Sequence, residues 1–409
     1  MRTSTLKYLL VILVAFILLL GAFSGGFLVG NSASFFDLVN NNNSSTTTAS
    51  NSTDSLDELF KPFWETWNYV NDKFVDQPVD QTKMMRGAID GMLNSLGDPH
   101  TSYMDPDMYR QASTPLQGEY DGIGAWVDLT GEFLTIISPM PNSPAEKQGL
   151  KPEDQVIAVD GEDVTELSGE QVLKKILGEA GTDVTLSIFR PVDNSTFDVT
   201  ITRQKIEIPS VTSKMIENNI AYVQLSNFGD KTHEELKKQL KGLLKEDPQG
   251  LILDLRNNGG GYLTAAIEVT SEFVNKSPIM YEEFGDGSRV TYDAKPLGIF
   301  TKLPMVILIN AGTASASEIT AGAIQDYKRG VLVGTQSYGK GSVQNWITLA
   351  DDQGAIRVTI ARWLTPNERQ INEIGLSPDY IVEITEDDIA AKIDPQLEKA
   401  IQLLLENEK

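Results

Sequence analysis

The sequence predicts a multidomain α+β protein with a helical N-terminal arm, a small β-barrel and an α/β domain. Three changes of pattern along the chain support this prediction. Apolar residues first recur at helical spacing, short β-rich runs follow, and continuous apolar strands then alternate with helices. We place the arm at residues 56–112, the barrel at 113–205, the α/β domain at 206–385 and a C-terminal helical segment at 386–409.

The arm is expected to contain two helices. The first carries an apolar face at helical spacing, made of Leu59, Phe60, Phe63, Trp64, Trp67 and Val70. The second runs from about Thr82 to Leu96 and ends in Gly97-Asp-Pro99. The aromatic face of the first helix either packs inside this chain or contacts a second copy of it, because a short helical arm has little core of its own.

The barrel is predicted from short β-rich runs with two helix candidates between them. The runs are Gly124–Val127, Leu134–Ile137, Val156–Val159, Val184–Phe189 and Phe197–Ile201, and the helix candidates are Pro144–Gln148 and Gly169–Gly178. The N–H groups of a glycine turn at Gly122, Ile123 and Gly124 can face a terminal carboxylate, while the next strand can accept an extended peptide by strand addition. Arg190, at the end of a strand, could contact a peptide or the next domain, or be an ordinary surface charge.

From residue 206 the pattern is that of a largely parallel sheet with crossover helices. The predicted strands are Ile220–Leu225, Gly250–Leu255, Met305–Ile309 and Val331–Gly334, and the predicted helices are Thr232–Leu244, Tyr262–Val274, Ser315–Tyr327 and Asp394–Glu406.

Composition narrows the chemistry. The 409 residues carry a net charge of −23, which argues against nucleic acid and against an anionic membrane surface as partners. The absence of cysteine excludes disulfides, thiolate metal sites and a cysteine nucleophile. With only two histidines in the chain, a Ser-His-Asp triad is nearly excluded, whereas a serine paired with a lysine base remains possible. We expect no metal and no cofactor.

The N-terminus predicts membrane attachment. Arg2 and Lys7 precede an uncharged apolar stretch at residues 8–30, which is long enough to span a bilayer. Residues 1–7 would then be a cytoplasmic tail, and the polar segment 31–55 a flexible linker to catalytic domains on the extracytoplasmic side of the cell membrane. A cleaved signal peptide ending near Ala22-Phe-Ser24 is the alternative.

Ser315 is the first candidate catalytic residue. It follows a buried strand and a short loop, and it opens a helix whose free N–H groups, beginning with Ala316, can bind an oxyanion. The same stretch, Ser315-Ala-Ser-Glu318, is also a capping box, in which the serine would only cap the helix.

Lys340 is the second candidate. It lies between two glycines just past a buried strand, and a desolvated lysine can act as a general base. Most lysines are solvated surface charges, so the position alone does not distinguish the two roles. Gln344 could orient the lysine amine by hydrogen bonding, or be an ordinary polar residue on a strand.

The run Asp254–Gly261 is the third element. Its three glycines follow a buried strand and open a helix, which makes a nest of N–H donors. A phosphate-binding loop is the rival interpretation, but the run lacks the Gly-Lys-Ser/Thr ending of a P-loop. An oxyanion-binding turn fits the serine better. Asp254 and Arg256 are expected to be structural.

Together these motifs resemble those of the carboxyl-terminal processing peptidases, also called tail-specific proteases. The resemblance covers nearly everything after about Leu56, and it rests on an ordered set of motifs: Gly97–Tyr103, Ser143–Leu150, Asp154–Gly161, Asp254–Gly261, Ser315–Glu318, Gly339–Gln344 and Gly375–Asp379. One departure is Gly259, which stands where the family usually has a proline before its paired glycines.

The resemblance implies a PDZ domain at 113–205 and a serine protease core of the crotonase/Clp-like β-β-α type. It implies that Ser315 is the nucleophile, Lys340 the general base and Gln344 the residue that orients the lysine, with Asp326 supporting the structure nearby. The resemblance also implies an oxyanion hole that uses the N–H of Ala316 and of a glycine in the 259–261 turn, for which Gly260 and Gly261 are the candidates.

The function expected from the sequence is that of a membrane-tethered serine endopeptidase that recognises apolar C-terminal tails of extracytoplasmic proteins. It would have no nucleic acid partner, and a homodimer is possible. A catalytically silent PDZ scaffold or adaptor is the alternative. An acyl-CoA enzyme on a similar core is disfavoured by the PDZ insertion and by the expected location outside the cell.

Overall fold

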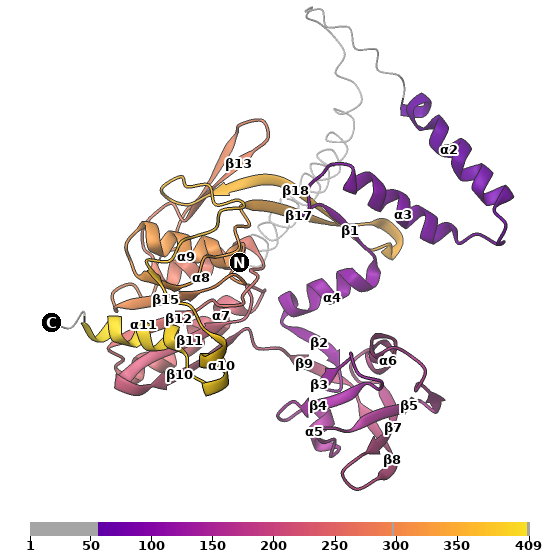
Figure 1. Cartoon of the computed structure of the whole chain (residues 1–409), viewed down its shortest axis with the longest axis horizontal. Helices are drawn as coiled ribbons and strands as arrows, with labels where there is room; N and C mark the ends of the chain where they lie inside the picture. The colour runs from indigo at the N-terminus through magenta and orange to yellow at the C-terminus, as the bar shows by residue number, and fades with distance from the viewer. Residues whose placement is uncertain (1–55, 297, 407–409) are drawn as a thin grey trace, which may run out of the picture. The chain divides into compact units, whose positions relative to one another are not determined.

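The computed structural model describes residues 56–296 and 298–406 (Figure 1). The chain divides into two compact units, residues 1–80 and 81–409, each of which is described by itself. The predicted cytoplasmic tail, membrane anchor and linker lie outside the described residues. Among the helices that are described, none is both long and apolar enough to cross a membrane.

The described part of the first unit is dominated by helix α2 (Leu56–Lys73), the first of the two predicted arm helices. No residue of α2 is buried. Its aromatic rings contact one another instead, with ring centroids of Phe63 and Trp64 at 5.1 Å and of Trp64 and Trp67 at 6.4 Å. The predicted aromatic face therefore exists and is accessible.

The second unit begins with the other predicted arm helix, α3 (Gln81–Asn94). A short strand, β1 (Ser102–Met104), and helix α4 (Pro106–Gln117) follow. Asp105 caps α4 by accepting hydrogen bonds from the N–H groups of Asp107 and Met108. The sequence analysis did not predict β1, which pairs with a strand of the core more than 250 residues away.

The barrel region is a six-strand sheet with two helices; five of its strands follow the order β3-β4-β5-β7-β8, and β6 pairs with β5 off this path. Its elements are β3 (Ala125–Asp128), β4 (Thr135–Pro139), α5 (Pro144–Lys147), β5 (Gln155–Val159), β6 (Glu162–Asp163, paired with β5), α6 (Gly169–Ile176), β7 (Asp183–Arg190) and β8 (Ser195–Thr202). Alternate residues of these strands, such as Val184, Leu186 and Ile188, fill one apolar core. A two-strand ribbon of β2 (Glu119–Gly122) and β9 (Gln204–Glu207) carries the chain into and out of this region.

Arg190 has a structural place in this region. Its guanidinium donates to both carboxylate oxygens of the buried Asp154, at 2.7 and 2.8 Å, and to the carbonyl of Gly149 at 3.0 Å. It also lies over the ring of Phe197, 4.8 Å from the ring centroid. Of the alternatives left open by the sequence, a free surface charge does not describe this arginine, which ties one end of β7 to the turn before β5.

The α/β region is built on a six-strand sheet in the order β10-β11-β12-β15-β16-β19. The strands are β10 (Val211–Ile216), β11 (Ile220–Leu225), β12 (Gly250–Asp254), β15 (Met305–Ile309), β16 (Val331–Gly334) and β19 (Tyr380–Ile381). All neighbours from β11 to β19 are parallel, and β10 is antiparallel to β11. The predicted parallel sheet is confirmed, and β12 and β15 are buried along their whole length because helices cover both faces.

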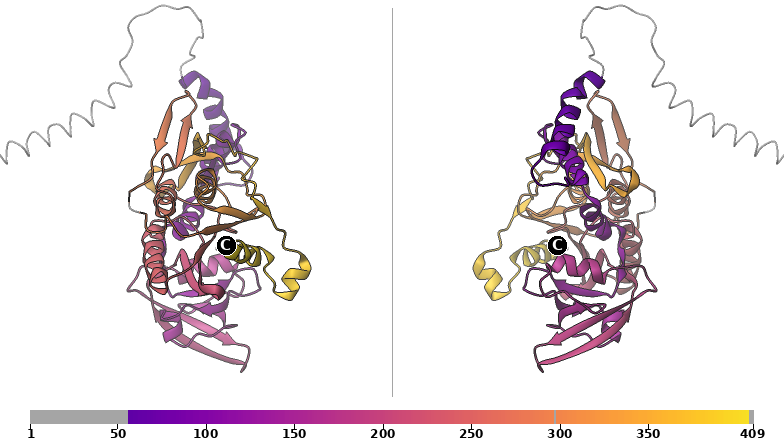
Figure 2. Two further views of the ribbon diagram at one scale, coloured as in Figure 1. Left: turned by 90° about the vertical axis from the view of Figure 1, so that its left-hand side faces the viewer. Right: turned by 90° about the vertical axis from the view of Figure 1, so that its right-hand side faces the viewer.

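Helices α7 (Thr232–Leu243), α8 (Leu263–Phe273) and α9 (Ala316–Asp326) pack on one face of this sheet, as predicted. The yellow C-terminal helix α11 (Pro395–Glu406) covers the other face, preceded by the short α10 (Glu386–Ala391) (Figures 1 and 2). Ala400, Leu403 and Leu404 of α11 meet Ile252 and Val306 of the sheet. Three short 3-10 helices lie at Glu217–Asn219, Leu244–Glu246 and Ala350–Asp352.

A second sheet was not predicted from the sequence. It joins β1, β18 (Ala355–Leu364), β13 (Met280–Phe284) and β14 (Arg289–Tyr292), and β17 (Ser342–Thr348) pairs with β18. Strands β17 and β18 form a long hairpin that begins two residues after Lys340 (Figure 1). Because β1 and β17 both pair with β18, this sheet brings Lys340, just before β17, close to β1 at the end of the arm.

Candidate active site

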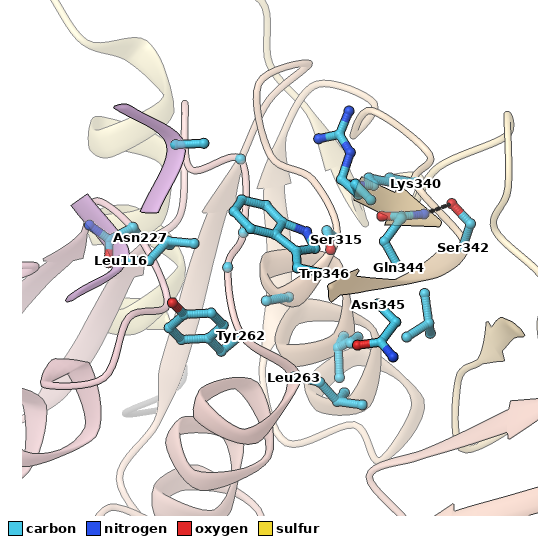
Figure 3. A pocket seen from close by; sticks show the side chains of 18 of the residues that line it. Leu116, Asn227, Tyr262, Leu263, Ser315, Lys340, Ser342, Gln344, Asn345 and Trp346 are labelled. Atoms are coloured by element: carbon cyan, nitrogen blue, oxygen red, sulfur yellow. Dashed lines mark hydrogen bonds between the residues drawn. The ribbon is translucent and has the colours of Figure 1, made fainter. Parts of the chain in front are cut away.

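Ser315, Lys340 and the glycine turn line one cleft of about 660 Å³. Helix α4 and the residue pair Ser226-Asn227 contribute to the same cleft, as do β17 and β18. Figure 3 shows Lys340, Gln344 and Ser342 on one side, Leu116, Asn227 and Tyr262 on the other, and Ser315 between them. The first and last of these three motifs are more than eighty residues apart in the sequence, and the fold brings all three to one cleft, as the sequence analysis expected.

Ser315 has an unusual backbone conformation, with φ 56° and ψ −116°. Ordinary N-cap residues are extended, so this serine is not held as a simple cap. It lies at a sharp turn between β15 and α9, which is the kind of strained strand-to-helix turn that exposes a nucleophile. A side chain on Gly260 would collide with this turn, because its Cβ would lie 2.7 Å from the Ala314 carbonyl oxygen and 2.9 Å from the Ala316 nitrogen.

Glu318 joins the backbone of Ser315 to that of Lys340, a connection that the sequence analysis missed. Its buried carboxylate accepts from the N–H of Ser315 at 2.8 Å and from the N–H of Lys340 at 2.9 Å. It also accepts from the hydroxyl of Ser337 at 2.6 Å and from the N–H of Gly339 at 2.7 Å. Burial raises the pKa of Glu318, and these hydrogen bonds oppose the rise. The SASE motif contained this signal, but we interpreted the glutamate only as half of a capping box.

Lys340 has the environment of a base rather than of a surface lysine. Burial lowers the pKa of its ammonium, and the Arg357 guanidinium lowers it further, while Asp98 and Glu318 act in the opposite direction. Among the described residues no hydrogen bond joins Lys340 Nζ to Ser315 Oγ. Such catalytic hydrogen bonds are often long in enzymes without substrate and tighten in the substrate complex.

Gln344 lines the cleft but does not bond the lysine in this structure. Its amide nitrogen donates to Ser342 Oγ at 2.7 Å and to Thr359 Oγ1 at 3.2 Å (Figure 3). These two hydroxyl groups hold the side chain on the strand hairpin. The role of orienting Lys340 thus stays a prediction.

The predicted oxyanion donors lie next to Ser315. Ala316 is the first residue of α9, so its N–H has no acceptor within the helix. The N–H of Gly260 already donates to Asn258 Oδ1 at 2.9 Å, and the carbonyl of Gly260 accepts from Phe228. Within the part of the chain that is described, no acceptor is recorded for the N–H of Gly261 or Gly259. Of the two glycines proposed, Gly261 is therefore the one with a free donor.

The loop at the end of the arm approaches the lysine. The pKa of His100 is lowered by burial and by the charge of Lys340, while Asp98 raises it. Arg357 donates from Nε to the His100 carbonyl at 2.9 Å. The sequence analysis treated this loop as a family signature only, and the long sequence separation hid its proximity to the catalytic centre.

The predicted carboxylate-binding turn lies beside β3, which pairs only with β4 and so presents an open edge. Gly124 has φ 76°, and a Cβ there would lie 2.5 Å from Ser143 Cβ, so the turn requires glycine. The carbonyl of Ile123 accepts from the N–H of Ala145 at 2.8 Å, which ties the turn to the start of α5. Burial raises the pKa of the Tyr120 phenol, and the N–H groups of Ala125 and Gly124, which face it, oppose the rise.

Asp254 and Arg256 are structural, as predicted. Arg256 donates to both oxygens of Asp254 and to Asp394 and Gln396 at the start of α11. Tyr222 also donates to Asp254, at 2.6 Å. Asp326 is likewise bound within the fold, where it pairs with Arg369 and accepts from the N–H of Asn367 at 2.8 Å.

Comparison with known proteins assigns the parts of the chain. Residues 219–382 match peptidase family S41, residues 135–190 match the PDZ domain, and residues 18–108 match the activating protease CtpB N-terminal domain. The carboxy-terminal-processing protease of Bartonella bacilliformis is 37% identical over 326 residues, which cover 78% of this chain and 74% of that one. The carboxyl-terminal-processing protease of Synechocystis sp. is 35% identical over 358 residues, covering 85% and 83%.

Among solved structures, the photosystem II D1 C-terminal processing protease aligns with 80% of this chain and 93% of its own, at 31% identity and a TM-score of 0.46. Fold, motifs and sequence likeness together define a PDZ-containing serine peptidase with a helical N-terminal region. The chain belongs to the carboxyl-terminal processing peptidases of family S41. This family membership confirms the predicted fold class, enzyme class and family. It also implies that the substrates are proteins.

Proposed function

We propose that this peptidase uses Ser315 and Lys340 as a catalytic dyad and that it cleaves extracytoplasmic proteins whose apolar C-terminal tails bind the PDZ domain. The observation that carries the dyad is a half-buried lysine with a lowered pKa in the same cleft as a strained serine at the start of a helix. A neutral amine is needed to take the serine proton, and burial beside a second cation favours that neutral form.

The proposed reaction is acyl transfer in two halves. Lys340 Nζ takes the proton of Ser315 Oγ as the oxygen attacks the scissile carbonyl carbon. The resulting oxyanion is stabilised by the N–H of Ala316 and by a glycine N–H of the turn. The lysine ammonium then gives its proton to the leaving amine, and water, deprotonated in turn by the lysine, releases the acyl group from the serine. Gln344 would hydrogen-bond the amine as it gains and loses its proton.

Tail recognition would use the turn at 122–124 and the open edge of β3. An extended tail can pair with β3, and partly buried apolar side chains such as Val127 and Leu173 favour apolar residues beside it. A charge-assisted set of N–H donors would hold the terminal carboxylate.

Location and assembly are proposed on separate grounds. Membrane tethering rests on the apolar stretch at residues 8–30, with Arg2 and Lys7 before it. A homodimer through α2 is supported by its accessible aromatic face, where the Trp64 side chain is 54% exposed. Sedimentation velocity of the chain with Trp64→Glu would test the dimer, and unchanged sedimentation would contradict it.

The dyad is tested by intact-mass spectrometry of an unfolded protein with an apolar tail, incubated with the wild-type peptidase and its variants. Ser315→Ala and Lys340→Ala should each lower turnover roughly a thousandfold or more, and the double variant should be no worse, as is usual for residues that act as a unit. Ser288→Ala and Lys241→Ala, both at exposed positions, serve as matched controls. Near-normal turnover by Lys340→Ala would refute the dyad, and a wild-type chain that binds but never cleaves would indicate a silent scaffold.

A further inference from the structure

Two positively charged side chains share the wall of the cleft. Arg357 lies on β18 and lines the same cavity as Lys340 and Ser315. Lys340 carries the charge that must be lost for catalysis under the proposed function. Arg357 cannot lose its charge in a protein, so Lys340 is the member of the pair that can become neutral.

The guanidinium of Arg357 is fixed by the arm and not by a counter-ion. Its Nε donates to the His100 carbonyl at 2.9 Å, and its Nη2 donates to Ser102 Oγ at 3.3 Å. Backbone pairing places Arg357 opposite Ser102 on one side and opposite Trp346 on the other. In the described residues 56–296 and 298–406, no carboxylate forms a salt bridge with Arg357. Partly buried arginines usually have a carboxylate partner. Without one, the positive charge of Arg357 disfavours the ammonium form of Lys340.

Two carboxylates near Lys340, those of Asp98 and Glu318, act against Arg357. Glu318, on α9, has its carboxylate shared among four donors, including the Ser337 hydroxyl and the Gly339 N–H. Asp98, in the loop before β1, accepts from Thr101 Oγ1 at 2.6 Å and from the His100 N–H at 3.1 Å. Both carboxylates favour the lysine ammonium, each by less than Arg357 disfavours it.

His100 is the remaining titratable group that faces Lys340. It is largely neutral near pH 7, because burial and the lysine charge lower its pKa. When it gains a proton in acid, the new positive charge further disfavours the lysine ammonium. Its titration therefore cannot cause a loss of free amine as the pH falls.

We propose that Arg357 is a positioning residue of the catalytic centre: a fixed positive charge, held by the end of the helical arm, that keeps Lys340 in its free-amine form. The proposal rests on the proposed role of Lys340 as the base. It implies that the arm loop contributes to catalysis, since two of its residues, His100 and Ser102, hold the guanidinium in place. A guanidinium in the cleft that only contacts substrate is the competing role.

The first test is the pH dependence of kcat/KM for wild type, Arg357→Gln and Arg357→Lys, with Arg362→Gln as the matched control. Arg362 is an exposed arginine on the same strand. Loss of the charge should move the acid-side midpoint of the profile up by about one pH unit, the size expected for a nearby charge. Activity at neutral pH should fall up to about tenfold and recover at high pH. Arg357→Lys should return the midpoint toward that of wild type, and Arg362→Gln should leave it unchanged.

Two outcomes would overturn the proposal. A loss of equal size at every pH would show that Arg357 only supports the fold, and a rise in KM at constant midpoint would show that it contacts substrate.

A second measurement does not depend on turnover. Lysine labelled with ¹³C is followed by NMR in the Ser315→Ala chain, and the Lys340 resonance is assigned by its absence in a chain that also carries Lys340→Arg. Arg357→Gln should raise the titration midpoint of that resonance by the same pH interval as the kinetic profile. An unchanged midpoint refutes the role of Arg357, even if proteolysis is impaired. If Lys340→Ala instead retains normal turnover, the proposed dyad fails while this titration still reports the effect of Arg357.

Discussion

At the residue scale, the fold shifts Lys340 toward the neutral amine that the proposed dyad requires. Its pKa is lowered from 10.5 by burial first and by Arg357 second. The active form is the deprotonated one, so activity should rise with pH through a single ionisation whose midpoint lies below 10.5. A pH profile of kcat/KM measures this midpoint, and an activity that falls with rising pH in the same range would contradict the assignment.

The same lowered pKa has a consequence for stability. Between its folded and unfolded pKa values, Lys340 binds more protons in the unfolded chain than in the folded one, so the free energy of unfolding rises with pH across that window. Lys340 therefore destabilises the fold at neutral pH. We expect Lys340→Met to unfold at a higher urea concentration than wild type at pH 7, with the difference shrinking as the pH approaches 10.5. A variant less stable than wild type at pH 7 would show that the ammonium is not penalised.

Glu318 gives a sharper residue-scale prediction, because the substitution Glu318→Gln keeps its shape. All four hydrogen-bond partners of Glu318 are donors. The glutamine side chain has an NH2 group, also a donor, in place of one carboxylate oxygen, so this group would face donors and lose the hydrogen bonds made there. We expect a loss of stability of about 1–3 kcal/mol, the usual penalty for buried unsatisfied groups. Because the bonds fix the backbone of both Ser315 and Lys340, kcat should also fall at least tenfold.

Chemical denaturation and steady-state kinetics on the same preparation check both parts of this prediction. Glu234→Gln, at an exposed position of α7, is the control. Full activity of the Glu318→Gln chain would mean that these four hydrogen bonds do not position the catalytic pair.

Individual residues were predictable from the sequence only where a local motif exposed them. Ser315 and Lys340 follow buried strands, and the structure brings them to one cleft. The position of Arg357 in that cleft, and its hydrogen bond to the His100 carbonyl, were not predictable, because both depend on the pairing of β1 with β18 across the length of the chain. Such pairing is set by tertiary packing and leaves no signal within either short segment.

At the element scale, the predicted α/β strands were found because they are buried on both faces and read as continuous apolar runs. The second sheet was missed because its strands carry mixed residues. β14 is exposed along three of its four positions, and β17 contains Gln344 and Asn345 in its middle. β18 has apolar residues distributed along its length and could have been recognised as a strand from its β-branched residues alone.

The element that awaits a direct test is the turn at 122–124 with the edge of β3. A fluorescent peptide ending in apolar residues should bind the full Ser315→Ala chain, and its C-terminal amide should bind about tenfold to hundredfold more weakly. This range corresponds to the roughly 1.5–3 kcal/mol of a hydrogen-bond set to a charged group. Fluorescence anisotropy measures both affinities. Equal affinity for acid and amide would place tail recognition elsewhere.

At the scale of the whole molecule, one ion-pair network links the oxyanion turn to the C-terminal helix. Arg256 follows β12 by two residues, leads into the glycine turn and bonds Asp394 just before α11. Gln396 of α11 adds bonds to Arg256 and to the Val382 carbonyl, so the helix is fixed at its first turn. The apolar side chains of α11 meanwhile cover one face of the sheet.

This network predicts how the protein responds to acid. Partial burial opposes ionisation of Asp394, but the hydrogen bonds from Arg256 outweigh it, so the pKa of Asp394 lies below its usual value. A lowered carboxylate pKa adds stability above the unfolded pKa, and that stability is lost as the pH falls through the folded pKa. Asp394→Asn should therefore lower the melting temperature at pH 7, by an amount reflecting about 1 kcal/mol or less for a pair that is partly exposed.

The difference in melting temperature between Asp394→Asn and wild type should shrink as the pH falls below 3.8 and should disappear only below the lowered pKa of the folded carboxyl, where the wild-type side chain is also neutral. Differential scanning calorimetry across pH 3–7 measures this difference in melting temperature. Asp387→Asn on α10 is the control, because the Asp387 carboxylate forms no hydrogen bond or ion pair with the described residues 56–296 and 298–406. Because Arg256 leads into the glycine turn, kcat of Asp394→Asn should also fall, whereas Asp387→Asn should leave it unchanged. A stability loss without any change in kcat would show that the network holds the C-terminal helix alone and does not set the oxyanion turn.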